Sequence, residues 1–353
     1  MTTSRISLKP NRLTITPQPR PKSAHNLFLR KIDAYTKAGQ LDSWQTNFKV
    51  RNSSFNLSSS TKRKIFDSIN LLHALSKPRA VKMRNGKTIF NFRAAFVTLS
   101  LPSVQAHEDI EIKKQCLNQF LIELRKHYGV KNYVWKAELQ MNENIHFHIV
   151  LDKYVDFQAL RRRWNRCINK LGYVDAYKAK MSALSLSEYH ALRCSQGSMD
   201  FVKNSQAFAK GKTSKWANPN SVDVKSVNST KSLASYLAKY ISKSFKDNEE
   251  NLTDCERGMQ FGRIWARSQS LSGYKTFAYQ FDDTMQMVVN FLKKNRNKTK
   301  VVKGEFYKIY FFNLDQLTGN LKKWLERHFI RCAFENNYPF PISLKNTVAY
   351  AYG

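Results

Sequence analysis

The sequence predicts an α+β fold in which helices pack on a central antiparallel β-sheet. The main observation is the order β, α, β, β, α of alternating and helical patterns along the middle of the chain. Two of these strand patterns lie close together, as in a hairpin, which favours antiparallel pairing. Hydrophobic residues make up 42% of the 353 residues, which is enough for a buried core. The element order is typical of a split βαβ unit, the RRM-like or ferredoxin-like arrangement.

The first elements precede this central pattern. Residues 1–58 are rich in basic side chains and contain four prolines within the first 21 positions. The start of this segment is therefore expected to be an irregular, mobile arm. Apolar residues at helical spacing predict a helix over 65–75. Residues 80–90 predict a β-hairpin with a tight Asn85-Gly86 turn.

The central elements follow in order. An apolar strand is expected over 94–101, and an amphipathic helix over 109–128 ends at a glycine. Alternating polarity predicts two strands, 133–139 and 145–151, and a basic helix over 157–171 comes next.

These elements suggest a division of the chain into three parts. Residues 59–285 form the predicted central domain, and the Ser- and Lys-rich segment 173–228 is an insertion in it that is expected to consist largely of loops. Residues 1–58 and 286–353 are the N-terminal and C-terminal extensions of this domain, and the second is basic and helical.

Charge and composition restrict the partners. The chain has 59 Lys and Arg against 26 Asp and Glu, a net charge of +33. Such an excess favours a polyanionic partner, and nucleic acid is the simplest one. No window contains the roughly 18 apolar residues of a membrane span, so no membrane partner is expected. The five cysteines are scattered without a CxxC pair, which favours a reducing cytoplasm.

Two histidines of the second central strand form the first candidate site. His146 and His148 are two positions apart, so both imidazoles leave the same face of the sheet while Phe147 enters the core. Two neighbouring imidazoles are poor core residues and good ligands for a divalent metal. A chance pair on a solvated strand is the alternative.

An acidic residue on the preceding strand adds to the histidine pair. If a three-residue turn spans 142–144 with an Asn in the left-handed region, Met141 opposes Ile145 and Glu138 opposes His148. Directly opposed residues share a face, so a carboxylate and two imidazoles would converge. Mixed nitrogen and oxygen ligands suit Mg²⁺ or Mn²⁺ with open positions. Gln140 has the same strand parity and is the alternative oxygen donor.

A second candidate site lies on a predicted helix over 232–244. Tyr236 and Tyr240 are four residues apart and therefore share a helix face, and each is followed three residues later by a lysine, Lys239 or Lys243. Tyrosine becomes a useful nucleophile when a metal activates the electrophile or when cations favour the phenolate. An aromatic stripe that packs on the sheet is the alternative.

Together these motifs resemble the HUH superfamily of single-strand DNA endonucleases, and most closely the rolling-circle replication initiators of small single-stranded DNA phages. The resemblance rests on the apolar strand 96–100, the His-hydrophobe-His motif with an upstream acid, and the tyrosine helix with its lysines, in this order. It covers residues 60–282, and residues 262–272 also resemble a segment that follows the tyrosine helix in these initiators.

The resemblance implies a fold and a reaction. The fold would be the HUH nuclease core, and Glu138, His146 and His148 would hold Mg²⁺ or Mn²⁺ at the scissile phosphate of a replication origin. Tyr236 or Tyr240 would attack, become linked to the 5′-phosphate and free a 3′-OH for a host polymerase, with a host helicase, in a bacterial cytoplasm. The second tyrosine would then cleave the regenerated origin, and the strand would be rejoined.

Basic residues around the tyrosine motif are candidates for DNA contacts. Residues 201–246 contain nine lysines and one acid, Asp223, and Lys225, Lys231 and the later Arg263 are singled out. A relaxase or transposase with the same chemistry is an alternative function. So is a non-enzymatic single-strand binder on an RRM-like sheet, which would need aromatic platforms on its strands.

Overall fold

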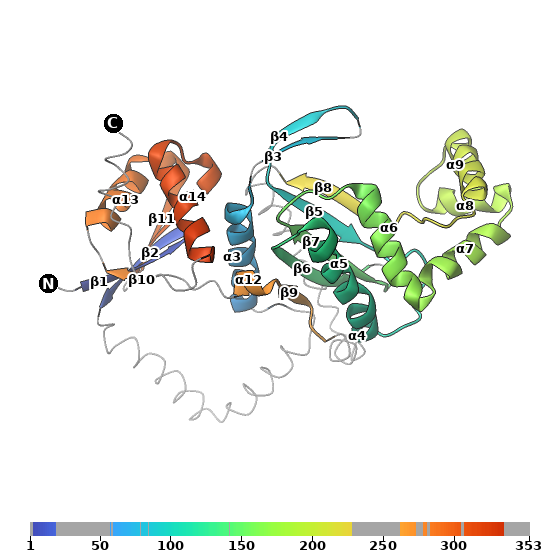
Figure 1. Ribbon diagram of the computed structural model, residues 1–353, viewed down its shortest axis with the longest axis horizontal. Coiled ribbons are helices and arrows are strands. Elements are labelled where there is room, and N and C mark those ends of the chain that lie inside the picture. Colours follow the sequence, from blue (N-terminus) through green and yellow to red (C-terminus); the bar gives the residue numbers. More distant parts are fainter. Residues whose placement is uncertain are drawn as a thin grey trace, which may run out of the picture.

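The computed structural model describes residues 3–18, 57, 59–77, 79–83, 85–140, 142–227, 262–272, 278–280, 283–304 and 307–334. In this part of the chain, two five-stranded sheets and a separate two-stranded ribbon are connected by helices (Figure 1). Both large sheets are antiparallel throughout. The predicted α+β class with a central antiparallel sheet is confirmed, and its finer description as a split βαβ unit stays a prediction.

The central sheet contains five strands in the order β8-β5-β7-β6-β9. Their bounds are β5 Ala94–Leu99, β6 Tyr133–Leu139, β7 Ile145–Leu151, β8 Val222–Val227 and β9 Trp265–Arg267. The bounds of β6 and β7 are those predicted from alternating polarity. Because β7 lies between β5 and β6, its side chains are in the middle of both faces of the sheet.

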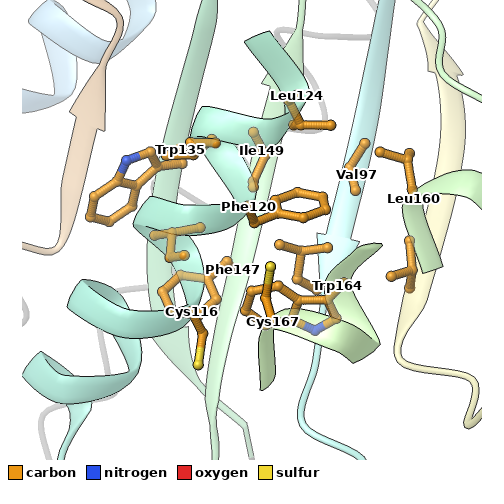
Figure 2. Close-up of a cluster of buried hydrophobic side chains, with 14 of the residues drawn as sticks. Val97, Cys116, Phe120, Leu124, Trp135, Phe147, Ile149, Leu160, Trp164 and Cys167 are labelled. Carbon is orange, nitrogen blue, oxygen red and sulfur yellow. The ribbon is translucent and has the colours of Figure 1, made fainter. Parts of the chain in front are cut away.

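One face of this sheet is covered by helices that enclose the main hydrophobic core (Figures 1 and 2). Phe147 of β7 extends into this core, where its ring lies 6.0 Å from that of Trp164. Gly129 ends the first of these helices in the left-handed conformation, as expected from the sequence. The helical elements are α4 (Asp109–Ile112), a π-helical segment (Lys113–Leu117), α5 (Asn118–Tyr128) and α6 (Phe157–Ile168).

The opposite face is covered at one end by a single helix, α3 (Ser59–Leu75). Ile65, Ile69 and Leu72 of this helix are buried against Phe96 and Val150 of the sheet. The other end of the same face, toward the C-terminal end of β5 and the N-terminal end of β7, carries the candidate site.

Two elements extend outward from the central sheet. The expected hairpin is confirmed as a ribbon of β3 (Arg79–Lys82) and β4 (Thr88–Phe92). The segment expected to consist of loops is instead largely helical, with α7 (Tyr173–Ala183), α8 (Leu186–Ser195) and α9 (Phe201–Thr213) after a short 3-10 turn, Asn169–Leu171. These helices enclose a small core of their own, formed by Met181, Tyr189 and Trp216.

The second sheet corrects the expectation of an irregular N-terminal arm. Residues 3–18 form a hairpin, and β2 of this hairpin pairs with β12, almost 300 positions later in the chain. Ile6, Leu8 and Leu13 of the hairpin are buried in the core of this unit. The sheet order is β10-β1-β2-β12-β11, with β1 Thr3–Lys9, β2 Arg12–Gln18, β10 Ala278–Gln280, β11 Thr299–Gly304 and β12 Tyr307–Phe312.

Helices complete this second unit and join it to the central one. Asp67 of α3 accepts hydrogen bonds from Lys9 at 2.7 Å and from Arg12 at 2.8 Å, so α3 contacts both sheets. Arg93 also pairs with Glu326 at 3.2 Å. The remaining elements are α12 (Gln269–Ser272), α13 (Asp283–Lys294), α14 (Gly319–Phe334) and 3-10 turns at Arg296–Lys298 and Leu314–Gln316.

Candidate functional site

The candidate site lies on the part of the sheet face that α3 leaves uncovered. The strand period of two places Glu138 of β6 and both His146 and His148 of β7 on this face. Phe96 of β5 lies on the same face, and its ring stacks on that of His148 at 5.3 Å. The structure therefore brings together the three residues that the sequence predicted as a cluster.

The predicted register of the hairpin is wrong by two residues. Glu138 opposes His146, and Lys136 opposes His148. The turn starts one residue earlier than expected, because Gln140 N donates to Asn144 O at 2.9 Å. The left-handed position is taken by Glu143, with φ of 62°. A shift of two residues preserves the face of each side chain, so the cluster still forms.

A buried asparagine explains this earlier turn. Asn144 is 3% exposed, and its side chain accepts a hydrogen bond from Gln105 N at 2.9 Å and donates one to Ser103 O at 2.8 Å. The Gln105 side chain in turn accepts from Ile145 N at 2.7 Å. These contacts hold Asn144 against the loop that follows β5, so it does not lie at the exposed tip of the turn.

Two hydroxyl groups from β5 and its end orient the imidazoles. Thr98 Oγ1 lies 3.2 Å from His148 Nδ1, and Ser100 Oγ lies 3.4 Å from His146 Nδ1. The ring centroids of the two histidines are 4.6 Å apart. Because a hydroxyl both donates and accepts, each can hold its imidazole in either tautomer. Both Nε2 atoms are then on the side away from β5.

The carboxylate of Glu138 is bound directly to this pair. His148 Nε2 donates to Glu138 Oε1, and the buried Lys136 lies with its Nζ 3.5 Å from Glu138 Oε2. Burial by itself raises the pKa of Glu138, but the hydrogen bond from His148 and the positive charges of His148, Lys136 and His146 outweigh it. The net result is a lowered pKa, so Glu138 is ionised at neutral pH.

Thr98, Ser100 and Lys136 were missed by sequence reasoning, because no motif marks any of them. The only available signal was parity, because Thr98 and Ser100 are spaced two apart on a strand, as are the histidines that they contact. Lys136 similarly precedes Glu138 by two positions, which places its side chain on the same face.

The donor set fits a hard divalent cation in type, with two imidazole nitrogens and one ionised carboxylate. Within the described residues, however, no group of three or more His, Cys, Asp or Glu side chains is already arranged around a metal position. Instead, the carboxylate of Glu138 and the imidazole of His148 bind one another. The assignment of a Mg²⁺ or Mn²⁺ site stays a prediction.

The predicted tyrosine motif lies outside the described residues. Tyr236, Tyr240, Lys239 and Lys243, as well as the predicted DNA contact Lys231, are all within 228–261. The described strand β8 ends directly before this segment and pairs with β5.

The two other predicted DNA contacts lie beside the site. Lys225 of β8 opposes Phe96 and therefore lies on the site face, where it is half exposed and pairs with Asp223 at 3.4 Å. Arg263 is exposed directly before Ile264, whose carbonyl accepts a hydrogen bond from Ala137 N at 2.8 Å. Both cations are at the edges of the sheet, on either side of the cluster.

Comparison with protein families gives one match. Residues 94–245 match the family model described as Replication-associated protein, of the ORF2 type. The matched span begins at β5, includes Glu138, His146 and His148, and extends past Tyr236 and Tyr240. The match supports a replication-initiator family, a role in DNA replication and DNA as the partner. Searches of curated proteins and of solved structures found no match.

The described helices were also compared with the requirements for a membrane span. None of them combines the length and the hydrophobicity that crossing a bilayer requires.

Proposed function

We propose that this chain is a rolling-circle replication initiator that nicks single-stranded DNA at an origin and rejoins it. The observation that carries the proposal is the Glu138, His146 and His148 cluster, which shares one open sheet face within the family-matched span. The net charge of +33 supports DNA as the substrate. The proposal includes a source in a single-stranded DNA phage and a site of action in the cytoplasm of its bacterial host.

The roles follow from the chemistry of each group. Glu138, His146 and His148 would hold Mg²⁺ or Mn²⁺, which when bound withdraws electron density from the scissile phosphate. Thr98 and Ser100 would accept from the Nδ1–H groups, which leaves the Nε2 lone pairs free. Lys136 keeps Glu138 ionised, and Lys225 and Arg263 would contact phosphates at the two edges of the sheet.

The tyrosines would carry the covalent chemistry. Tyr236 or Tyr240 would lose its proton, and the oxygen would attack the scissile phosphorus and displace the 3′-oxygen, which leaves as a 3′-OH. A 5′-phosphotyrosyl bond conserves the energy of the broken phosphodiester, so a later 3′-OH can reverse the step and close a circle. Lys239 and Lys243 would favour the phenolate. A host polymerase and helicase would extend and unwind the strand.

A covalent-adduct assay tests this function. Single-stranded circular DNA is incubated with the protein and Mn²⁺ and analysed on a denaturing gel. We expect a protein–DNA adduct that needs the metal and is lost in the Tyr236→Phe/Tyr240→Phe double variant. Glu138→Gln, His146→Ala and His148→Ala are expected to lower the adduct yield at least about 100-fold, as is typical when metal polarisation is removed.

Matched variants make the result specific. His127→Ala removes an exposed imidazole from α5, on the other side of the sheet, and is expected to leave the yield unchanged. Calorimetric titration with Mn²⁺ should show weaker binding in His148→Ala than in His127→Ala. An adduct that persists in the double tyrosine variant, or DNA binding without any adduct, would overturn the nicking proposal and favour a binding protein.

A further inference from the structure

The ribbon β3–β4 is a surface that the nicking chemistry does not use. Its base is fixed in the main core by Val81, 8% exposed, and Phe92, fully buried. Its tip turns at Asn85 and Gly86, where Gly86 has φ of 79° and donates to Met83 O at 3.0 Å. Figure 1 shows that the ribbon extends beyond the body of the central unit.

A β-bulge places one aromatic side chain in solvent. Val81 opposes Ile89 and Arg79 opposes Phe92, so two residues of β4 lie opposite the single Ala80. The extra residue allows both Ile89 and Phe92 to pack on the core and turns Phe90 outward. Phe90 is 72% exposed, although a phenyl ring on a strand usually packs against its sheet.

The ribbon is also uniformly cationic. Arg79, Lys82 and Lys87 are exposed on it. No acidic residue occurs anywhere over 68–107, which contains six Lys and Arg, so these charges are not balanced along the sequence. A basic two-stranded ribbon has dimensions that fit the groove of duplex DNA. An exposed phenyl ring provides a surface on which a base can stack.

We propose that the ribbon binds base-paired DNA at the junction with the single strand that is nicked. Lys82 and Lys87 neutralise phosphates of the duplex, and Phe90 stacks on its terminal base pair. The inference rests on the proposed function in taking the origin DNA as the ligand, and it adds a recognition element for duplex DNA beside the nick.

The strand geometry sets the distance between the two sites. Arg93 alone separates the ribbon from β5, whose six residues lead to Ser100 beside His146. At about 3.3 Å per residue, the base of the ribbon and the site are about 20 Å apart along the strand. This corresponds to about six nucleotides at 3.4 Å each, so the junction is expected about six nucleotides from the cleaved bond.

Equilibrium binding of the full chain tests the proposal. The probes are a forked duplex with two unpaired arms, the matching blunt duplex and the matching single strand, with 2-aminopurine in the terminal pair of the fork. We expect Phe90→Ala to weaken fork binding roughly tenfold, the size of one lost stacking contact. The variant should also abolish the 2-aminopurine fluorescence change, while single-strand binding changes less than about twofold.

Charge variants test the phosphate contacts. Lys82→Gln/Lys87→Gln is expected to reduce the salt slope of log K for fork and duplex by about 2, one for each lost contact. Phe201→Ala, a 53% exposed phenylalanine of α9, and Lys178→Gln/Lys180→Gln on α7 are the matched controls and should bind as wild type. All substituted side chains are exposed, and circular dichroism checks that each variant is folded.

Two results would overturn the proposal. One is fork binding by the ribbon variants that equals wild type on every probe, which would leave the ribbon to a protein partner. The other is a wild-type protein that binds the fork no better than the single strand. Adduct formation on single-stranded circles is measured in parallel. If adducts never form but the ribbon variants still lose fork binding, the nicking proposal fails and the ribbon proposal stands.

Discussion

Replacing Trp164 by phenylalanine tests how the core supports the site. Trp164 is fully buried on α6, and its indole Nε1 donates to the carbonyl of Ser100 at 2.8 Å. The side chain of Ser100 contacts His146, so this hydrogen bond connects the core to the site. The variant keeps an aromatic ring and removes the donor.

Two terms give the expected loss of stability. A phenyl ring leaves a space of roughly 40 Å³ where the indole was, and about 24 cal/mol per Å³ makes this ~1 kcal/mol. The carbonyl of Ser100 loses its partner, which costs ~1–2 kcal/mol. We therefore expect the free energy of opening around β7 to fall by ~2–3 kcal/mol.

A second tryptophan provides the control. Trp216 is 6% exposed, and its Nε1 has no hydrogen-bond partner among the described residues. Trp216→Phe creates a similar space without breaking a hydrogen bond, so its cost is ~1 kcal/mol or less. Native-state hydrogen exchange, measured separately on amides of β7 and α9, gives both opening free energies. Equal losses in the two variants would refute the argument that the indole donor stabilises the site.

Three further predictions concern other parts of the chain. Burial lowers the pKa of His328 to about 4, so the unfolded state binds more protons below pH 6.5, and stability should fall by up to ~3 kcal/mol between pH 6.5 and 4; urea denaturation of His328→Gln should show a weaker fall. Asp67→Asn removes the ion pairs of Asp67 with Lys9 and Arg12 and should reduce stability by ~1–2 kcal/mol, with increased protease cleavage within residues 3–18. Asn144→Ala removes both hydrogen bonds to the loop after β5 and should cost ~2 kcal/mol in thermal denaturation, whereas exposed Asn142→Ala should cost less than ~0.5 kcal/mol.

Local patterns predicted the strands of the central sheet because each strand has one side in the core. The alternation over 133–139 and 145–151 is a direct record of which residues enter that core, and it also placed Glu138, His146 and His148 on one face. The register of the hairpin was less accessible. It depends on Asn144, whose partners Gln105 and Ser103 are about 40 residues away in sequence.

The second unit was missed for a related reason. Ile6, Leu8 and Leu13 alternate as strand residues do, but a short hairpin with prolines nearby has no local feature that distinguishes it from an irregular arm. Its burial depends on β12 and α14, which come almost 300 residues later. Such long-range pairing leaves no mark on the local sequence.

This pairing also affects the chain while it is being synthesised. β2 leaves the ribosome with the first residues, but β12 follows only after about 290 more, which takes ~15–60 s at ~5–20 residues per second. During this interval the apolar side of the first hairpin is exposed next to a nascent chain that carries most of the protein's positive charge. The second unit can close only when translation has passed β12, so a product that ends early keeps an uncovered β-edge, which is a substrate for chaperones and proteases.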